Sequence, residues 1–427
     1  MTPDAGRPRA RIVVTGSELV RGERTDLNGP FLARELHALG IEPVEVTIVG
    51  DAEEDLARAL EAGLQADLCV TSGGLGPTHD DRTVEMLARA TGRQLVVDDA
   101  LRAEIDAVSR RIAERLGRPY AEFEPGVTKQ ASLPEGAAAI GLAGTAPGLI
   151  LDENGTVVIV LPGPPGELQR LWASALETEP LRRLLGRTAP PARRVLRFFG
   201  VSESAVARAL ADAGGDEEGV ETTICARDFE IHVDVVAESD AAARADALVA
   251  RLREPLEQHL FSVTEDPVEA LVLNLCRQAG LTLGTAESCT GGLVAARLTS
   301  VPGSSDVFRG GIVSYADDVK RELLGVPEEI LKWHGAVSAE AAAAMASGAR
   351  RALGVDVAVS VTGVAGPGGG TPEKPVGLVF VHAEGPDGGL AVELGIPGER
   401  SAIRTRAVVT ALHVVRRLLT QSRHKVA

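Results

Sequence analysis

The first part of the chain alternates short apolar runs with longer segments in which apolar residues recur every three or four positions. The short runs predict strands, and the longer period predicts helices. The predicted strands are residues 10–15, 44–49, 67–71 and 157–161. The predicted helices are residues 28–40, capped by Asn28 and ended by Gly40, then 53–64, helices within 81–116, and 167–185. This β-α-β-α order predicts a three-layer α/β domain, in which helices cover both faces of a parallel sheet and ligands bind at the carboxyl ends of its strands.

A proline-containing segment, residues 187–193, separates this domain from two further units. The first has the order strand, helix, strand, strand, helix over residues 195–199, 203–213, 222–226, 230–236 and 241–259. That order predicts a small two-layer α+β unit. The second begins at about residue 264 and predicts another α/β domain. Its predicted strands are residues 282–286, 311–315, 356–361, 377–383 and 390–394, and its helices include 339–352 and 399–420.

The composition indicates a globular protein with an acidic surface. Apolar residues make up 44% of the 427 residues, enough for sizeable cores, but aromatic residues only 3%. The net charge of −16 repels phosphate backbones and anionic lipid, so direct nucleic-acid binding and membrane binding are not expected. The four cysteines form no CxxC pair, residues 1–11 do not resemble a signal peptide, and no run of about 18 uncharged apolar residues occurs. We therefore expect a cytoplasmic protein.

The first candidate site follows the strand predicted at residues 67–71. Residues 73–83 read GGLGPTHDDRT, and the three glycines let the backbone approach a ligand closely at the start of a helix, which suits a diphosphate. Asp80 and Asp81 would repel phosphate, so the pair indicates a hard divalent cation. The alternative is that the glycines only form a turn and the two acids only cap a helix. The candidate ligand contacts are Gly73, Gly74, Gly76, Thr78, Thr83 and Asn28, and the candidate metal ligands are Asp80, Asp81 and Glu18.

The second candidate site follows the strand predicted at residues 282–286. Residues 286–292 read AESCTGG, which places Ser288 and Cys289 at the N-terminus of a helix, where the dipole favours a nucleophile and an oxyanion. The sequence alone does not separate Ser288 from Cys289 as the nucleophile. The next strand leads into Tyr315 and Lys320, and a desolvated lysine can act as a general base. The alternatives are that Cys289 is a small buried apolar residue and Lys320 a solvated lysine.

A third glycine-rich loop, residues 361–370, is expected to complete this second site as a ligand cradle. Arg400 and Arg404 are one helical turn apart and are expected to clamp a phosphate. The candidate substrate contacts are Thr290, Gly291, Gly292, Thr362, Gly363, Gly366, Arg400 and Arg404.

Together these motifs resemble the CinA family of competence/damage-inducible proteins. The likeness runs nearly end to end and is carried by residues 73–83, GTAPG at 144–148, LPGPP at 161–165, AESCTGG at 286–292 and TGVAGP at 362–367. The middle unit is similar to the family's KH-type domain in element order only. Its turn at residues 214–219, GGDEEG, is acidic where a KH module carries a basic clamp, so a spacer or dimer-forming role is expected rather than RNA binding. The resemblance implies a molybdopterin-binding-like ADP-ribose pyrophosphatase domain at 1–170, a helix and linker at 171–192, a KH-type α+β domain at 193–262 and a CinA C-terminal α/β deamidase domain at 263–427.

The same resemblance implies two activities in pyridine nucleotide recycling. The first domain would hydrolyse ADP-ribose to AMP and ribose 5-phosphate, with a divalent metal (Mg²⁺ or Co²⁺) and K⁺. The last domain would convert nicotinamide mononucleotide (NMN) to nicotinic acid mononucleotide and ammonia without a cofactor, with Ser288 as nucleophile, Lys320 as base and Tyr315 assisting. A homodimer is also implied. The rival hypotheses are a scaffold whose first domain binds a pterin or nucleotide without turnover, and a DNA-binding protein, against which the net charge of −16 argues.

Overall fold

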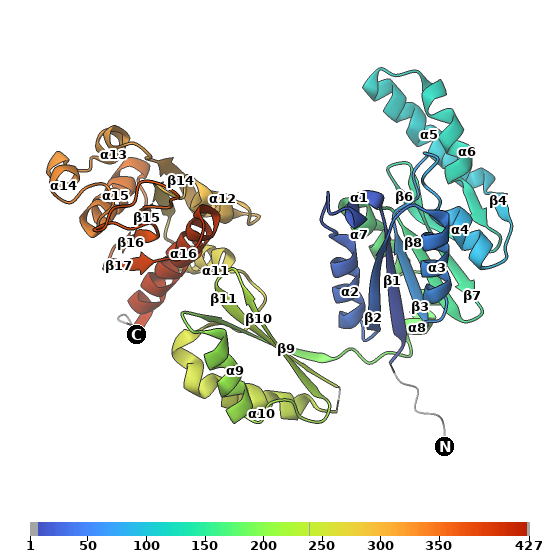
Figure 1. The fold of residues 1–427 in the computed structure, drawn as a ribbon, viewed down its shortest axis with the longest axis horizontal. Coiled ribbons are helices and arrows are strands. Elements are labelled where there is room, and N and C mark those ends of the chain that lie inside the picture. The colour runs from blue at the N-terminus through green and yellow to red at the C-terminus, as the bar shows by residue number, and fades with distance from the viewer. Residues whose placement is uncertain (1–6, 239, 425–427) are drawn as a thin grey trace. The chain divides into compact units, whose positions relative to one another are not determined.

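The strand β1 (Arg9–Thr15) lies inside a six-stranded sheet with the order β2-β1-β3-β8-β7-β6. This arrangement comes from a computed structural model that describes residues 7–238 and 240–424 (Figure 1). The first four strands of the sheet are parallel, as predicted, but β7 pairs antiparallel with β8, and β6 antiparallel with β7. The sheet is therefore mixed, because the chain turns back through a hairpin at the GTAPG segment instead of crossing over through a helix.

Helices cover both faces of this sheet, which gives the expected three layers. Ile12 and Val14 point into one core with α2, α7 and α8, whereas Val13 points into the opposite core with α3, α4 and α5. The strands are β1, β2 (Glu42–Val49), β3 (Leu68–Ser72), β6 (Ala138–Ala143), β7 (Ala146–Glu153) and β8 (Thr156–Leu161). The helices are α1 (Ser17–Val20), α2 (Asn28–Ala38), α3 (Glu53–Gly63), α4 (Thr83–Ala90), α5 (Asp99–Leu116), α6 (Glu124–Gln130), α7 (Pro165–Ala175) and α8 (Glu179–Leu185), and β4 (Leu95–Val97) pairs with β5 (Ser132–Pro134) beside them.

Three local predictions for helices need correction. Asn28 begins α2 but does not cap it; the Asp26 carboxylate accepts the backbone N–H groups of Asn28 and Gly29 instead. The single helix predicted at 167–185 is two helices, α7 and α8, and Pro180 lies in the first turn of α8, where its missing N–H costs nothing. The helix predicted at 241–259 ends at Arg253, and a 3₁₀ helix that has Pro255 in its first turn continues to His259.

Contacts divide the chain into two compact units, residues 1–192 with 237–242, and residues 193–236 with 243–427. The second unit holds two sheets, with the orders β10-β11-β9-β12 and β14-β13-β15-β16-β17. The first of these sheets carries β9 (Ala192–Phe199), β10 (Val220–Arg227), β11 (Glu230–Ala237) and β12 (Leu260–Ser262), with α9 (Glu203–Asp212) and α10 (Ala242–Arg253).

The last sheet is the middle layer of a second three-layer arrangement. β13 pairs in parallel with β14 and β15, whereas β16 and β17 are antiparallel. One face packs against α15, and the other against α11 and α16. The strands are β13 (Leu283–Glu287), β14 (Phe308–Val313), β15 (Val357–Gly363), β16 (Leu378–Gly385) and β17 (Gly388–Gly395). The helices are α11 (Val268–Ala279), α12 (Leu293–Thr299), α13 (Asp317–Leu324), α14 (Glu328–Trp333), α15 (Ala339–Leu353) and α16 (Arg400–His424). No helix in the described ranges is both long enough and apolar enough to traverse a bilayer.

Candidate active sites

The carboxyl ends of β13, β14 and β15 meet at one edge of the last sheet and bring the second predicted site together. Ser288 directly follows β13, and its backbone N–H donates to the carbonyl of Val361 on β15 at 2.9 Å. On the other side, Ser314 follows β14 and donates its N–H to the carbonyl of Glu287 at 2.8 Å. Three loops that are far apart in the sequence, beginning at residues 288, 314 and 364, therefore lie next to each other, as expected for parallel strands.

Ser288 and Lys320 are both withdrawn from solvent at this edge. The Ser288 residue is 8% exposed and Lys320 is 1% exposed, so the prediction that Lys320 is a desolvated lysine is favoured over a solvated one. Lys320 Nζ donates to the backbone carbonyl of Tyr315 at 3.1 Å and lies 3.6 Å from a carboxylate oxygen of Asp317. No hydrogen bond within the described ranges joins Ser288 Oγ to Lys320 Nζ. The two groups share a region of the fold, but a proton would pass between them only after Nζ moves or through a water molecule.

Glu287 has a role that the sequence did not reveal. The residue is 1% exposed, and its carboxylate accepts the backbone N–H groups of Gly292, Val294 and Ala295 at 2.9 to 3.1 Å. These groups form the N-terminus of α12, so the positive end of this helix is already neutralised by a buried carboxylate. The Gly292 N–H is therefore already used by Glu287 and is not free to stabilise an oxyanion.

Two N–H groups next to Gly291 and Ser288 are better candidates than the Gly292 N–H as donors to an oxyanion. The Gly291 N–H is used by the Ser288 carbonyl at 3.1 Å. The N–H groups of Cys289 and Thr290, by contrast, have no oxygen partner within the described part of the chain. They directly follow Ser288 in a turn that Gly291 and Gly292 close with φ of 61° and 97°, conformations that favour glycine. This arrangement offers two adjacent donors beside the Ser288 hydroxyl.

The structure favours Ser288 over Cys289 as the nucleophile. Cys289 is 5% exposed and belongs to the hydrophobic core of this domain. Burial raises the pKa of its thiol to about 11. At neutral pH almost no thiolate is present, and the thiolate is the reactive form of cysteine.

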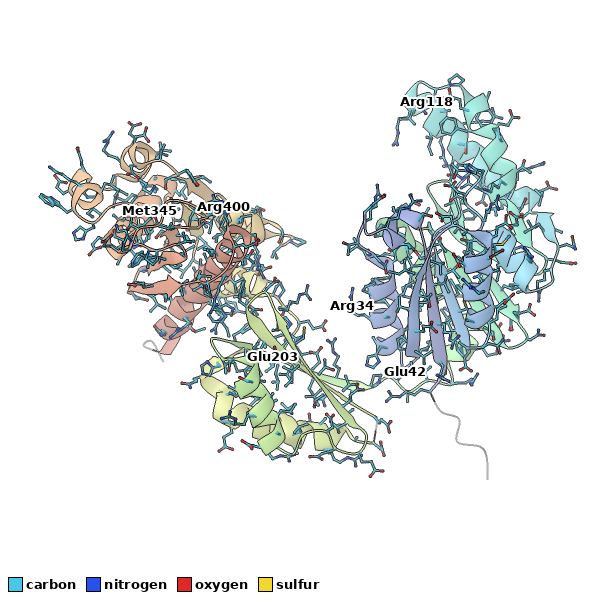
Figure 2. The ribbon with its side chains drawn as sticks, in the orientation of Figure 1. Arg34, Glu42, Arg118, Glu203, Met345 and Arg400 are labelled. Atoms are coloured by element: carbon cyan, nitrogen blue, oxygen red, sulfur yellow. The ribbon has the colours of Figure 1, made fainter. Side chains whose placement is uncertain are left out.

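Arg400 and Arg404 hold the loops of this edge in place. Arg400, labelled in Figure 2 at the start of α16, donates to the Gly366 carbonyl at 2.8 Å and to the Tyr315 hydroxyl at 3.2 Å. Arg404 donates to the Thr290 carbonyl at 2.8 Å. Both arginines therefore already bind protein oxygens, and their predicted role as a phosphate clamp would have to use the guanidinium nitrogens that remain.

The other predicted contacts of this site differ in availability. Tyr315 is 61% exposed, so its ring can reach a ligand. Thr362 is fully buried and donates its hydroxyl to the Ala336 carbonyl at 2.7 Å. Gly363 and Gly366 are close to β16 and to Val376, because a Cβ on either would lie 2.6 to 2.7 Å from a neighbouring atom. The Thr362 hydroxyl is therefore already used, and the two glycines shape the loop and offer only backbone groups to a substrate.

The first predicted site forms a cleft of about 370 Å³ in the N-terminal unit. The glycine-rich loop after β3 provides one wall, and the segment after β8 provides another. The predicted residues that line it are Gly73, Gly74, Gly76, Asp80, Asp81 and Glu18. The glycines are required by close approach: a Cβ at Gly74 would lie 2.1 Å from Thr83 Oγ1, and a Cβ at Gly76 would lie 2.4 Å from an Asp81 carboxylate oxygen.

Three predicted contacts of the first site do not line this cleft. Thr83 is fully buried and donates its hydroxyl to the Gly73 carbonyl at 2.8 Å. The Asn28 amide donates to Ser72 Oγ at 2.9 Å and to the Gly163 carbonyl, so it links the end of β3 to the segment after β8. Thr78 is exposed, and its hydroxyl contacts the carboxylates of Asp80 and Asp81. The Thr78 hydroxyl bond is the main reason that the pKa of Asp80 is lowered.

The carboxylates of the first site match the ligands of a hard divalent cation only in part. Within the described ranges, no three His, Cys, Asp or Glu side chains come close enough together to hold a metal, so Glu18 does not join the aspartates in a ready-made site. Asp80 and Asp81 are nevertheless bridged by one hydroxyl and face the same cleft. Two carboxylates fit Mg²⁺, which is commonly bound by one or two carboxylates with water and substrate phosphates as the other ligands.

Comparison with known proteins places the chain in a family. A CinA-like protein of Mycolicibacterium paratuberculosis (strain ATCC BAA-968 / K-10) is 42% identical over 432 residues, which cover 97% of this chain and 99% of the relative. The chain belongs to the CinA family. A CinA-like protein of Mycobacterium tuberculosis (strain ATCC 25177 / H37Ra) is also 42% identical, over 96% of this chain and 97% of its own length. The resemblance inferred from the motifs is confirmed.

Family models agree with this membership of the CinA family. Residues 11–182 match the model described as "Probable molybdopterin binding domain", 193–262 match "Damage-inducible protein CinA KH domain", and 265–419 match "CinA C-terminal domain". These matches confirm the predicted three-part fold class. The competence/damage inducible protein CihA of Agrobacterium tumefaciens is 42% identical over 38% of this chain and 99% of its own, with a TM-score of 0.35, which is too low to support a structural argument.

Two acidic residues of the N-terminal cleft of this CinA-family chain were missed. Asp51 follows β2, so its place after a parallel strand was a usable signal. Its carboxylate accepts the hydroxyl of Ser17 at 2.6 Å. Glu167 lies in the first turn of α7, after the LPGPP segment, and burial raises the pKa of its carboxyl group. That segment carried the family resemblance, but nothing in the sequence indicated that a partly desolvated acid would follow it.

Proposed function

We propose that the C-terminal domain hydrolyses the carboxamide of NMN to nicotinic acid mononucleotide and ammonia. The observation that carries the proposal is the convergence, at one strand edge, of a buried serine, a buried lysine and two N–H groups that have no oxygen partner among the described residues. Family membership supports a hydrolase. The exposed Tyr315 ring and the nitrogens that Arg400 and Arg404 leave unused are available to bind the nucleotide.

In the proposed reaction, Ser288 Oγ attacks the amide carbon while its proton passes to the Lys320 amine. The N–H groups of Cys289 and Thr290 stabilise the oxyanion that forms on the former carbonyl oxygen. Lys320 then protonates the leaving amine, ammonia departs, and water hydrolyses the acyl-enzyme to release the acid and restore Ser288. General acid–base catalysis of this kind contributes roughly 10²- to 10⁴-fold in rate.

The two adjacent residues Ser288 and Cys289 supply a matched test. Ser288→Ala should abolish ammonia release from NMN, whereas Cys289→Ala should keep most of it. The opposite result would show that the thiol is the nucleophile. Lys320→Met preserves the length and burial of the side chain and removes the amine. It should lower kcat by about two orders of magnitude or more without loss of folding, and full activity in this variant would exclude Lys320 as the base.

For the N-terminal domain we propose hydrolysis of ADP-ribose to AMP and ribose 5-phosphate. The cleft of about 370 Å³, with a glycine-rich loop beside paired aspartates, supports this second activity. Asp80 and Asp81 would hold a divalent cation, which would neutralise the diphosphate and activate water when bound. The glycine-rich backbone would position the phosphates close to that pair.

Turnover separates this proposal from a binding scaffold. The enzyme should release many AMP molecules per chain in Mg²⁺, and EDTA or Asp81→Asn should abolish this release while NMN hydrolysis continues. Saturation at one ligand per chain without product would support the scaffold. The requirement for K⁺, the homodimer and the cytoplasmic location stay predictions, which K⁺ titration, light scattering and cell fractionation would check.

A further inference from the structure

A second cavity, of about 450 Å³, lies within the C-terminal unit, between its KH-type and CinA C-terminal domains. The KH-type domain contributes the segment from Phe199 to Ser202 and also Phe229, and the C-terminal domain contributes one face of α16 and two residues of β17. None of its lining residues belongs to either candidate active site. The volume lies in the range of cavities that enclose small organic ligands.

The two charged side chains that line this cavity are both positive. Arg406 and Arg417 both line it, and neither forms an ion pair or a side-chain hydrogen bond with any residue in the described ranges. No Asp or Glu appears among the lining residues. Burial, followed by the nearby charge of Arg417, lowers the pKa of Arg416 on the same helix. Two arginines in one cavity without an ion-pair partner among the described residues are unexpected in a chain with a net charge of −16, because carboxylates are abundant enough to pair with them.

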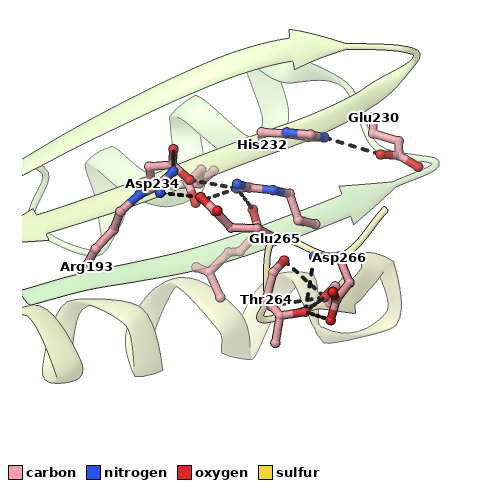
Figure 3. A network of polar contacts seen from close by, with 11 residues as sticks. Arg193, Glu230, His232, Asp234, Thr264, Glu265 and Asp266 are labelled. Atoms are coloured by element: carbon pink, nitrogen blue, oxygen red, sulfur yellow. Dashed lines mark hydrogen bonds and ion pairs between the residues drawn. The ribbon is translucent and has the colours of Figure 1, made fainter. Parts of the chain in front are cut away.

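The inner wall of the cavity is aromatic and contains an unsatisfied nitrogen. The ring of His413 is fully buried and stacks on Phe199, with centroids 3.8 Å apart and planes within 9°. His413 Nε2 pairs with a Glu230 carboxylate oxygen at 2.7 Å, and Glu230 also contacts His232 (Figure 3). Nε2 therefore carries the hydrogen of the neutral ring, and Nδ1 is left as an acceptor with no partner in the described part of the chain. A buried unpaired nitrogen calls for a donor from a ligand or from water.

The rest of the wall suits a flat, apolar body. Val392 and Leu394 of β17 and Val414 of α16 face the cavity together with Phe199. The Arg406 guanidinium lies 5.3 Å from the ring centre of Phe229, so one of the two cations already stacks on an aromatic face at the rim. The cavity thus combines apolar walls with Arg417, with Arg406 at the rim, and with an acceptor nitrogen that has no partner in the described residues.

We propose that this cavity binds a small aromatic phosphate of the size of a nucleoside monophosphate, with its ring against the Phe199 wall and its phosphate held by Arg417, one turn after His413 on α16. Arg406, three turns earlier on the same helix, adds its positive charge at the rim. Guanidinium groups bind phosphate through paired, charge-assisted hydrogen bonds, and the apolar wall accepts a base or another flat ring. The site is separate from the two proposed catalytic sites and does not depend on either activity.

The test is calorimetric titration of the full-length protein with AMP, adenosine and inorganic phosphate. AMP should bind, adenosine and phosphate should each bind more weakly than AMP, and Arg406→Ala with Arg417→Ala should weaken one AMP-binding component at least about tenfold. Both side chains are exposed, so circular dichroism should show an unchanged fold. Arg309→Ala is the matched control, because Arg309 is also exposed and unpaired in the described structure but does not line the cavity.

Variants at the catalytic sites distinguish this cavity from the other nucleotide sites. The AMP-binding component that the double arginine variant removes should persist in Asp81→Asn and in Ser288→Ala. The proposal is overturned if AMP does not bind, if AMP binding is equal in the double variant and the wild type, or if Asp81→Asn or Ser288→Ala removes that component.

Discussion

Arg404 donates a hydrogen bond to the backbone carbonyl of Thr290 at 2.8 Å and so joins two segments that are 114 residues apart in the sequence. Arg400, one turn earlier on α16, binds the Gly366 carbonyl and the Tyr315 hydroxyl in the same way. The first turns of α16 therefore fix all three loops around Ser288. The two arginines act as positioning residues for the turn that carries Ser288.

Loss of Arg404 should impair catalysis through this turn. We expect Arg404→Ala to lower kcat for NMN at least about tenfold, because the loss of a charge-assisted bond frees the Thr290 carbonyl and the adjacent N–H donors. Arg404→Lys keeps one donor and should give an intermediate kcat. Steady-state kinetics, with the unfolding midpoint measured in parallel, would check this. An effect on KM alone would indicate that Arg404 only binds substrate.

Replacement of Glu287 should destabilise the domain. Glu287→Gln removes the charge that accepts three backbone N–H groups at the start of α12, and we expect a loss of about 2 kcal/mol in the free energy of unfolding. Urea denaturation followed by circular dichroism would measure it. Glu329→Gln, on the exposed face of α14, is the control and should change stability by less than about 0.5 kcal/mol. Equal stability of both variants would show that the buried carboxylate contributes little.

The glycine-rich loop of the N-terminal cleft offers a matched pair of substitutions. Gly74 and Gly92 have nearly the same φ, 68° and 65°, so alanine imposes a similar backbone strain of about 1 kcal/mol at both. Only at Gly74 does a new Cβ meet an obstacle, Thr83 Oγ1 at 2.1 Å. Gly74→Ala should abolish AMP release from ADP-ribose and leave NMN hydrolysis intact, whereas Gly92→Ala should keep both activities. Loss of both activities in Gly74→Ala would point to general misfolding.

The buried pair Glu230 and His413 should make the C-terminal unit sensitive to acid. Burial alone would raise the pKa of Glu230, but hydrogen bonds from His232 and His413 outweigh it and lower the pKa from 4.5 to about 2. Burial lowers the pKa of His413 below 6.5. In both cases the unfolded chain binds protons that the folded chain does not, so stability should fall as the pH drops below about 6.5, and fall further between 4.5 and 2.

Urea unfolding at a series of pH values would test this dependence. For Glu230, the shift in pKa corresponds to at most about 3 kcal/mol, fully present above pH 4.5. Glu230→Gln should flatten the acid limb of the stability curve relative to Glu329→Gln. A variant that follows the wild-type curve in this range would show that Glu230 does not carry the effect.

Sequence reasoning identified both candidate sites because each rests on backbone features that local sequence encodes. The structure contains the features that were predicted: glycines after a strand, a polar residue at the strand end, and Arg400 and Arg404 one turn apart on a helix. It misassigned Asn28, since the choice between capping α2 and bonding Ser72 depends on which group folding brings within reach. The mixed sheet was missed for a similar reason. The antiparallel hairpin of β6 and β7 joins the sheet through the pairing of β7 with β8, and β8 comes after both strands in the sequence.

The role of Glu287 shows what a motif leaves out. The AESCTGG segment indicated a helix N-terminus beside Ser288, but not that the residue before Ser288 would turn back to occupy it. The same holds for His413, which reads as one polar residue on an amphipathic helix and meets Glu230 from 183 residues earlier in the chain. Such contacts follow from tertiary packing, which no local pattern contains.

Arg404 and His413 belong to one unbroken helix, and each is bound to a different partner, Thr290 at one end and Glu230 further along. Every residue added to or removed from the stretch between them would rotate one contact by about 100° around the helix axis relative to the other. Relatives that keep both contacts must therefore hold the length of this stretch constant, even where its side chains diverge.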